Sequence, residues 1–302
     1  MQVVRLLKLP LLLTAAILTS TAVAEDRTLT LASSGLDRLE IDAGAGSLLV
    51  QGVSNSDEIR VEATINADPD DYTLTLEKNG SSAKLVSKID SDSNIRFFFG
   101  RSHYIDLKVY LPKSMQLEVD DGSGDTSIAD LAGSVRIDDG SGSLEVKNIG
   151  GDIVIDDGSG DMTLVSIAGN VAITDGSGGI TIETVGGTLE ANDGSGDFTA
   201  TDIGGGIQLT DGSGNLTLRK IGGSVDIDDG SGDVRLEDII GDVAIGDGSG
   251  TIRIKGVDGH VKIHDGSGDI IVASVSRGLT IAEDGSGSVS TDNISGNVEI
   301  ND

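Results

Sequence analysis

The residues with the clearest chemical potential in this 302-residue sequence are the aspartates of a tetrapeptide, Asp-Gly-Ser-Gly, that occurs ten times. Asp-Gly favours a tight turn with positive φ, and an aspartate carboxylate accepts hydrogen bonds from backbone N–H groups two residues later. Carboxylate oxygens are also ligands that calcium prefers. The candidate metal ligands are therefore the ten turn aspartates: Asp121, Asp139, Asp157, Asp175, Asp193, Asp211, Asp229, Asp247, Asp265 and Asp284.

Two interpretations of these aspartates follow. If the turns stack, the carboxylates form a row about 4.8 Å apart, and each neighbouring pair repels by about 1 kcal/mol even at the dielectric constant of water. Backbone N–H groups can offset this repulsion, in which case the aspartates only cap turns. Calcium that bridges successive turns is the alternative, and no other cofactor is indicated. The pattern differs from the calcium-binding nonapeptide GGxGxDxUx, because the residue two places after the second glycine is apolar rather than acidic.

Other catalytic or nucleotide chemistry has little support. The serines of the turns lie between glycines, as a nucleophile does, but the chain has only three histidines, and no nucleophile and base recur together. His260 and His264 lie about 13 Å apart along an extended strand, too far to share one zinc ion. No GxGxxG or phosphate-loop pattern occurs. We therefore expect that the protein is not an enzyme.

Two further functions are less favoured. Polysaccharide lyases also use β-helices, and Arg235 and Arg253 occupy equivalent outward positions near acidic rows, but the repeats lack the aromatic platforms of sugar clefts. An ice-binding surface needs parallel rows of threonine, and the sequence offers one short row that ends at Arg235: Thr163, Thr181, Thr199 and Thr217.

The spacing of the turns indicates the element that must position them. The first nine turns recur every 18 residues and the tenth follows one inserted residue, so residues 121–302 form an internal repeat array. Apolar residues fall two and four places after a glycine that recurs every nine residues, which predicts short strands with one buried face. The repeat therefore predicts an all-β, right-handed, single-stranded parallel β-helix, a two-sided β-solenoid with 18-residue coils. The left-handed hexapeptide helix is disfavoured because it requires an inward residue every six positions.

Residues 25–120 predict an irregular β region that supplies the first coils and a cap. The stretch LEIDAGAGSLLVQGV (39–53) resembles one coil, and alternating strands follow at 59–65, 72–76, 83–89 and 105–111. A cap is needed because an exposed strand edge invites aggregation. An aromatic cluster beside basic residues is interpreted as part of this cap or, alternatively, as a partner-binding loop: Phe97, Phe98, Phe99 and Tyr104.

The N-terminal segment indicates where the protein is located, and the net charge limits the partners it can bind. Residues 1–24 predict a signal peptide, because Arg5 and Lys8 precede an apolar stretch and Ala22-Val23-Ala24 makes a small-residue cleavage site. No later run is long and apolar enough to predict a transmembrane segment in the mature chain. The chain has no cysteine and a net charge of -29. Without the two signal-peptide cations, 19 basic residues face 50 acidic ones, which gives -31 and disfavours nucleic acid as a partner.

The repeated units are also similar to those of a known protein family. The coil at 39–53, the proline-bearing stretch IDLKVYLPKSMQLEVDDGSGD (105–125) and the units GSGD and IGGDV resemble the bacterial putative-adhesin family of exported β-strand-repeat proteins, mostly of unknown function. The resemblance covers about residues 36–302. It implies a single-stranded β-helix outside the cytoplasm and an adhesin role, and it supplies no catalytic motif.

Together these patterns predict a non-catalytic, exported adhesion or scaffold module of the bacterial envelope, either periplasmic or on the cell surface. The expected partner is an unidentified envelope protein or glycan. A calcium-dependent binding protein is the alternative, and a polysaccharide-active enzyme is less favoured. The last segment, NVEIND, leaves a strand edge guarded only by acidic residues, which predicts end-to-end self-association.

Overall fold

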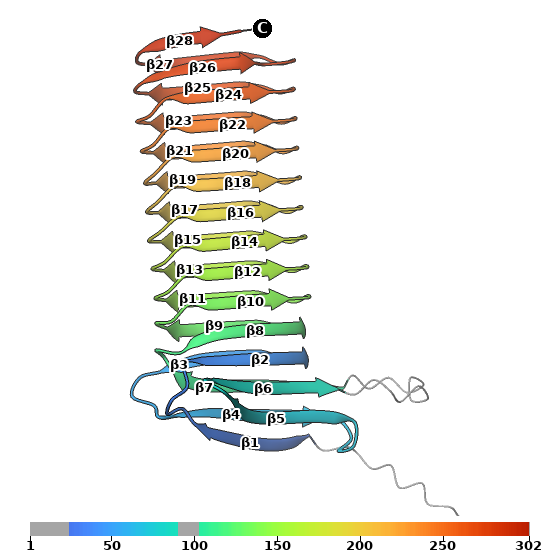
Figure 1. Cartoon of the computed structure of the whole chain (residues 1–302). Helices are drawn as coiled ribbons and strands as arrows, with labels where there is room; N and C mark the ends of the chain where they lie inside the picture. The colour runs from blue at the N-terminus through green and yellow to red at the C-terminus, as the bar shows by residue number, and fades with distance from the viewer. Residues whose placement is uncertain (1–23, 90–102, 302) are drawn as a thin grey trace, which may run out of the picture.

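The computed structural model describes residues 24–89 and 103–301, which form 28 β-strands and no helix. The predicted signal peptide lies almost wholly outside these residues. The strands form two 14-stranded sheets that face each other along a straight stack (Figure 1). The fold is a β-solenoid, as the repeat predicts.

The two sheets are named here sheet A and sheet B, and each is given in stack order. Sheet A contains β1 (Glu25–Ala32), β4 (Glu58–Asn66), β7 (Tyr104–Pro112), β3 (Leu48–Val53), β9 (Thr126–Leu131), β11 (Leu144–Ile149), β13 (Met162–Ile167), β15 (Ile180–Val185), β17 (Phe198–Ile203), β19 (Leu216–Ile221), β21 (Val234–Ile239), β23 (Ile252–Val257), β25 (Ile270–Val275) and β27 (Val289–Ile294). Sheet B contains β5 (Tyr72–Asn79), β6 (Ser82–Ile89), β2 (Arg38–Ala45), β8 (Gln116–Ser123), β10 (Val135–Asp139), β12 (Ile153–Asp157), β14 (Val171–Asp175), β16 (Leu189–Asp193), β18 (Ile207–Asp211), β20 (Val225–Asp229), β22 (Val243–Asp247), β24 (Val261–Asp265), β26 (Gly278–Glu283) and β28 (Asn297–Ile300).

From β8 onward, one coil consists of one sheet B strand followed by one sheet A strand. Equivalent strands pair in parallel with an offset of 18 residues, as Val135 of β10 aligns with Ile153 of β12. The offset changes only near the end, where the register shifts between Ile263 and His264. This shift corresponds to the inserted residue before the tenth turn.

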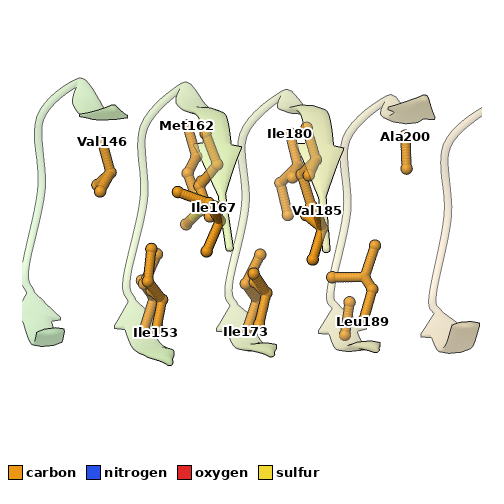
Figure 2. Packing of buried hydrophobic residues seen from close by; sticks show 14 of the residues in the cluster. Val146, Ile153, Met162, Ile167, Ile173, Ile180, Val185, Leu189 and Ala200 are labelled. Carbon is orange, nitrogen blue, oxygen red and sulfur yellow. The ribbon is translucent and has the colours of Figure 1, made fainter. Parts of the chain in front are cut away.

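The core fills the space between the two sheets. Each five-residue strand of sheet B buries its first, third and fifth residues, whereas each sheet A strand from β9 to β25 buries its first, third and sixth. The sheet A pattern skips a position because its fifth residue has a left-handed backbone, as at Asn148 with φ 55°. Met162 of sheet A and Ile153 of sheet B extend into this core from opposite sheets (Figure 2).

The first coils are not stacked in sequence order. The segment 39–53 forms one coil, as predicted, with β2 under β8 and β3 under β9. Strands β6 and β7 come later in the chain but lie on the opposite side of this coil, against β2 and β3. Below them, β4 pairs antiparallel with β7, β5 pairs antiparallel with β6, and β1 pairs antiparallel with β4. This antiparallel set covers the N-terminal end of the solenoid.

Candidate functional site: the file of turn aspartates

Nine of the ten turn aspartates lie inside the solenoid. Burial alternates along each sheet B strand, and the aspartate takes the third inward position, after Val135 and Ile137 in β10. Nine aspartate residues are only 0–4% exposed and lie in register, one per coil. We call this row the buried file, and its members are Asp121, Asp139, Asp157, Asp175, Asp193, Asp211, Asp229, Asp247 and Asp265.

Each carboxyl group of the file uses one oxygen to hold its own turn. From Asp139 to Asp265, Oδ1 accepts the backbone N–H of the serine two residues later at 2.9–3.2 Å. The backbone carbonyl of Asp139 accepts the N–H of Gly158 in the next coil at 2.8 Å, and this bond recurs along the stack. The aspartates therefore cap the turns in the way that Asp-Gly chemistry favours.

The second oxygen of most file members has no protein partner. In every member from Asp139 to Asp265, Oδ2 is buried without a hydrogen bond. Asp121 differs, because its Oδ2 accepts the hydroxyl of Thr126 at 2.7 Å while its Oδ1 is left unpaired. The residue in register with Thr126 is Leu144 in the next coil and is apolar in every later coil. The unpaired oxygens therefore lie in an apolar environment, where an unpaired charge is costly.

This environment changes the protonation of the file. Burial, together with repulsion from Asp247 and Asp211, raises the pKa of Asp229 to about 7. Burial and neighbouring aspartates likewise raise the pKa of Asp139 and Asp193 to about 6. The remaining members are shifted in the same direction. Near neutral pH the file therefore carries fewer than nine negative charges, which reduces the repulsion that stacking predicts.

The geometry gives calcium few ligands. Within residues 24–89 and 103–301, no group of three or more His, Asp or Glu side chains is placed to hold a metal ion. Calcium takes six to eight oxygens, whereas each coil offers one unpaired carboxylate oxygen beside an apolar side chain. Asp284, the tenth turn aspartate, is only half-buried and lies outside the file. Calcium binding by the ten turn aspartates stays a prediction.

The structure shows a second, exposed set of caps that sequence reasoning missed. Where the residue directly after a turn is Asp or Asn, its side chain accepts the backbone N–H of the equivalent residue in the next coil at 3.0–3.2 Å, as Asp161 does from Gly179. The aspartates among these caps occupy alternate coils, so no two lie on adjacent rungs: Asp125, Asp161, Asp197, Asp233 and Asp269. Their 36-residue period is the sequence signal that could have identified them.

The predicted aromatic cluster lies mostly outside the described part of the chain. Phe97, Phe98 and Phe99 lie outside the described residues, and the half-buried Tyr104 begins β7. Partner binding by this aromatic cluster stays a prediction.

Arg235 and Arg253 are register neighbours on the outer face of sheet A, as their spacing predicts. Arg235 forms an ion pair with Glu237, and Arg253 forms one with Asp233 at 3.0 Å. The predicted threonine row also lies in register on this face.

No helix among residues 24–89 and 103–301 is long and apolar enough to cross a membrane.

Several solved structures resemble the chain at low sequence identity. A protein from Clostridium sporogenes ATCC 15579, described as a putative cell adhesion protein, is 11% identical, covers 71% of this chain and 99% of its own, and has a TM-score of 0.30. A putative lipid binding protein from Parabacteroides distasonis ATCC 8503 is 15% identical over 92% of this chain and 97% of its own, with a TM-score of 0.35. A putative adhesin from Bacteroides fragilis NCTC 9343 is 11% identical over 92% and 97%, with a TM-score of 0.29.

The family comparison is more direct. No curated protein matches the chain. The Toastrack DUF4097 family matches residues 36–223, which include the out-of-order first coils and the repeats as far as β19. This match covers more than half of the 302 residues and agrees with the resemblance of the repeated units. The chain is therefore a member of the Toastrack DUF4097 family.

Proposed function

We propose that this protein is a non-catalytic, exported β-solenoid that acts as an adhesion or scaffold module in the bacterial envelope. The observation that supports this role is the register of outward side chains, which makes each sheet face a long surface and gives sheet A a row of like residues. Solenoids commonly bind partners along such extended surfaces. The protein would be periplasmic or on the cell surface, and its partner an envelope protein or glycan.

The threonine row makes the outer face of sheet A the better candidate for this contact. Thr163, Thr181, Thr199 and Thr217 occupy consecutive coils of β13–β19. Their hydroxyl groups both donate and accept hydrogen bonds, which suits a hydroxylated or amide-bearing partner. The equivalent coils of sheet B expose a more mixed set, including Ala172, Thr174 and Asn192.

The test is co-sedimentation of the mature chain with isolated envelope fragments. We expect the double variant Thr181→Glu, Thr199→Glu to bind at least about tenfold more weakly, because it introduces two carboxylates into the contact. The matched control is Thr174→Glu, Thr210→Glu on sheet B, which should bind as the wild type does. Protease or glycan-cleaving treatment of the fragments identifies the partner class. A wild-type chain that fractionates with the cytoplasm, or that does not co-sediment with envelope fragments, would contradict the proposal.

Calcium-dependent binding is the second candidate, favoured by the unpaired Oδ2 atoms of the file. Thermal melting with calcium and with chelator, at one ionic strength and with magnesium as control, separates it from turn capping. A calcium-specific rise in the midpoint that disappears in Asp193→Asn, Asp211→Asn supports it. An unchanged midpoint excludes it. End-to-end self-association also stays a prediction.

A further inference from the structure

The two outer faces of the solenoid carry different charge. The second and fourth residues of the sheet A strands from β9 to β27 include five cations and four anions: Lys147, Arg219, Arg235, Arg253, Lys255, Glu145, Glu183, Glu237 and Asp292. The exposed fifth residues add one cation and three anions: Lys220, Asp130, Asp202 and Asp238. The outward positions of sheet B from β8 to β28 hold two cations and nine anions: Arg136, Lys262, Glu118, Asp120, Asp138, Asp156, Glu190, Asp226, Asp228, Glu283 and Glu299. A face near neutrality and a strongly acidic face therefore lie back to back.

The charges concentrate in two strips of three coils. The basic strip is Arg219, Arg235, Arg253 and Lys255 on β19, β21 and β23, interrupted by Glu237. The acidic strip is Glu118, Asp120, Asp138 and Asp156 on β8, β10 and β12, interrupted by Arg136. An exposed apolar residue adjoins each strip: Ile271, 40% exposed, follows Arg253 in register, and Val154, 38% exposed, follows Arg136.

The geometry of a coil allows the two strips to meet when one solenoid lies beside another. Sheet A and sheet B strands run in opposite directions (Figure 1), and each exposes two outward files two residues apart. If two solenoids lie parallel, related by translation, the first outward file of sheet A faces the second of sheet B, and the second faces the first. The rung spacing of about 4.8 Å is common to both faces, so the files remain matched along the contact.

With a shift of five coils, the charges match rung by rung. Arg219 faces Glu118, Arg235 faces Asp138, and Arg253 faces Asp156. The two interruptions also face each other, because Glu237 lies opposite Arg136. Two coils earlier, Glu183 faces Lys84 of β6. Within the two outward files of the described strands, the one like-charged pair is Asp292 with Glu190, near the end of the overlap.

An antiparallel arrangement of the same strips is less favourable. Reversing one solenoid brings Arg235 opposite Arg136 and Glu237 opposite Asp138, which places like charges in contact at the centre of the strip. We propose that the outer face of sheet A binds the acidic outer face of sheet B of a second copy of this chain, side by side, parallel and displaced by five coils. Such a contact is heterologous and leaves a free face on each copy, so it builds an open, staggered row. This inference does not depend on the envelope partner proposed above.

The net charge of the chain opposes this association at low ionic strength. At about 0.15 M salt the Debye length is about 8 Å, so charges across the contact still interact while distant ones are largely screened. We therefore expect weak, concentration-dependent oligomers at physiological salt.

Charge reversal tests the contact by sedimentation velocity. Arg219→Glu, Arg253→Glu reverses sheet A, and Glu118→Lys, Asp156→Lys reverses sheet B at the facing positions. Each double variant alone should associate at least about tenfold more weakly than the wild type, whereas a mixture of the two should associate again because the reversed faces match. All four positions are on outer faces, and melting curves verify the fold. A monomeric wild type at high concentration, or a mixture that stays monomeric, overturns the proposal.

The five-coil register can be tested by cross-linking introduced cysteines, because the chain has no cysteine of its own. In the five-coil shift Ile271 faces Thr174. In a one-coil shift, which pairs the same number of opposite charges but does not bring the two strips together, Ile271 faces Gly246. A short thiol-to-thiol cross-linker should join copies of Ile271→Cys, Thr174→Cys. It should not join copies of the matched control Ile271→Cys, Gly246→Cys. The reverse result overturns the five-coil register.

Discussion

A carboxyl group that is buried with one unpaired oxygen destabilises the fold unless a donor reaches that oxygen. The first coil contains such a donor, because Thr126 donates its hydroxyl to Asp121. In the later coils an apolar side chain takes the same position, as Val234 does beside Asp229. The protein therefore allows a comparison between a carboxyl group that has a hydroxyl donor and its repeats, which have none.

This comparison predicts the effect of Val234→Thr. The new hydroxyl should donate to Oδ2 of Asp229, lower the pKa of that carboxyl from about 7, and raise the free energy of unfolding at pH 8 by about 1 kcal/mol. Titration followed by NMR and denaturant melts measure the two effects. The control is Val243→Thr, an inward position at the other end of a sheet B strand. It should lower the free energy of unfolding by about 1–3 kcal/mol, because its hydroxyl has no carboxylate partner. Equal effects of the two substitutions would contradict this account.

The sequence predicted the turn-capping role of the aspartates but not their burial. The signal was present, because Asp139 continues the alternation of Val135 and Ile137. A polar residue in that phase is ordinarily placed outside, since charged residues are seldom fully buried. Here the serine N–H of the turn donates a hydrogen bond to the aspartate Oδ1, which allows the carboxyl group to be buried.

At the scale of the element, the file couples stability to pH. The folded-state pKa values of its members lie above the ordinary value of 3.8, reaching about 6 to 7. A folded state that binds protons more tightly than the unfolded state gains stability as pH falls. The melting temperature should therefore rise as pH falls from 8 to about 5, with the stabilisation lost again as pH rises through 6 to 7. The exposed Asp233 and Asp269 have lowered pKa values and weaken the fold only below pH 3.8. A melting temperature that falls steadily from pH 8 to 5 would refute this coupling.

The glycines that end the turns set how closely coils approach. Gly160 has φ 143°, and a Cβ built there would lie 1.6 Å from the carbonyl oxygen of Gly142 in the coil below. Gly160→Ala should therefore lower the free energy of unfolding by several kcal/mol, more than the roughly 1 kcal/mol of a typical substitution. Gly246→Ala is the control, because its Cβ would find its nearest atom at 3.7 Å, on an outer face. It should be neutral or slightly stabilising in the same denaturant melts. Comparable losses at both positions would show that coil spacing is not the cause.

At the scale of the whole molecule, the repeat predicted the array better than it predicted the cap. Period and alternation define a regular coil, so strand positions from β8 onward followed from the sequence. Residues 25–120 lack a period, and their strands were predicted without their partners. Nothing in the local pattern indicates that β6 and β7 pass below β2 and β3, because that order depends on contacts between distant segments.

The stack also predicts the shape of the particle. Two 14-stranded sheets at about 4.8 Å per strand give a length of about 60 Å, well above the sheet separation of about 10 Å. Small-angle scattering of dilute protein should give the distance distribution of an elongated particle, with a long tail. A symmetric distribution typical of a globule would contradict the stacked register.

The crossed order of the first coils has a consequence for how the chain folds. The coil of β2 and β3 is complete only when β6 and β7 cover one side and β8 and β9 the other. About 130 residues must therefore leave the ribosome before the lowest rungs close, and each later coil then adds to a finished template. Growth of the rod is expected to proceed in one direction, from a slow nucleus to rapid addition of single coils.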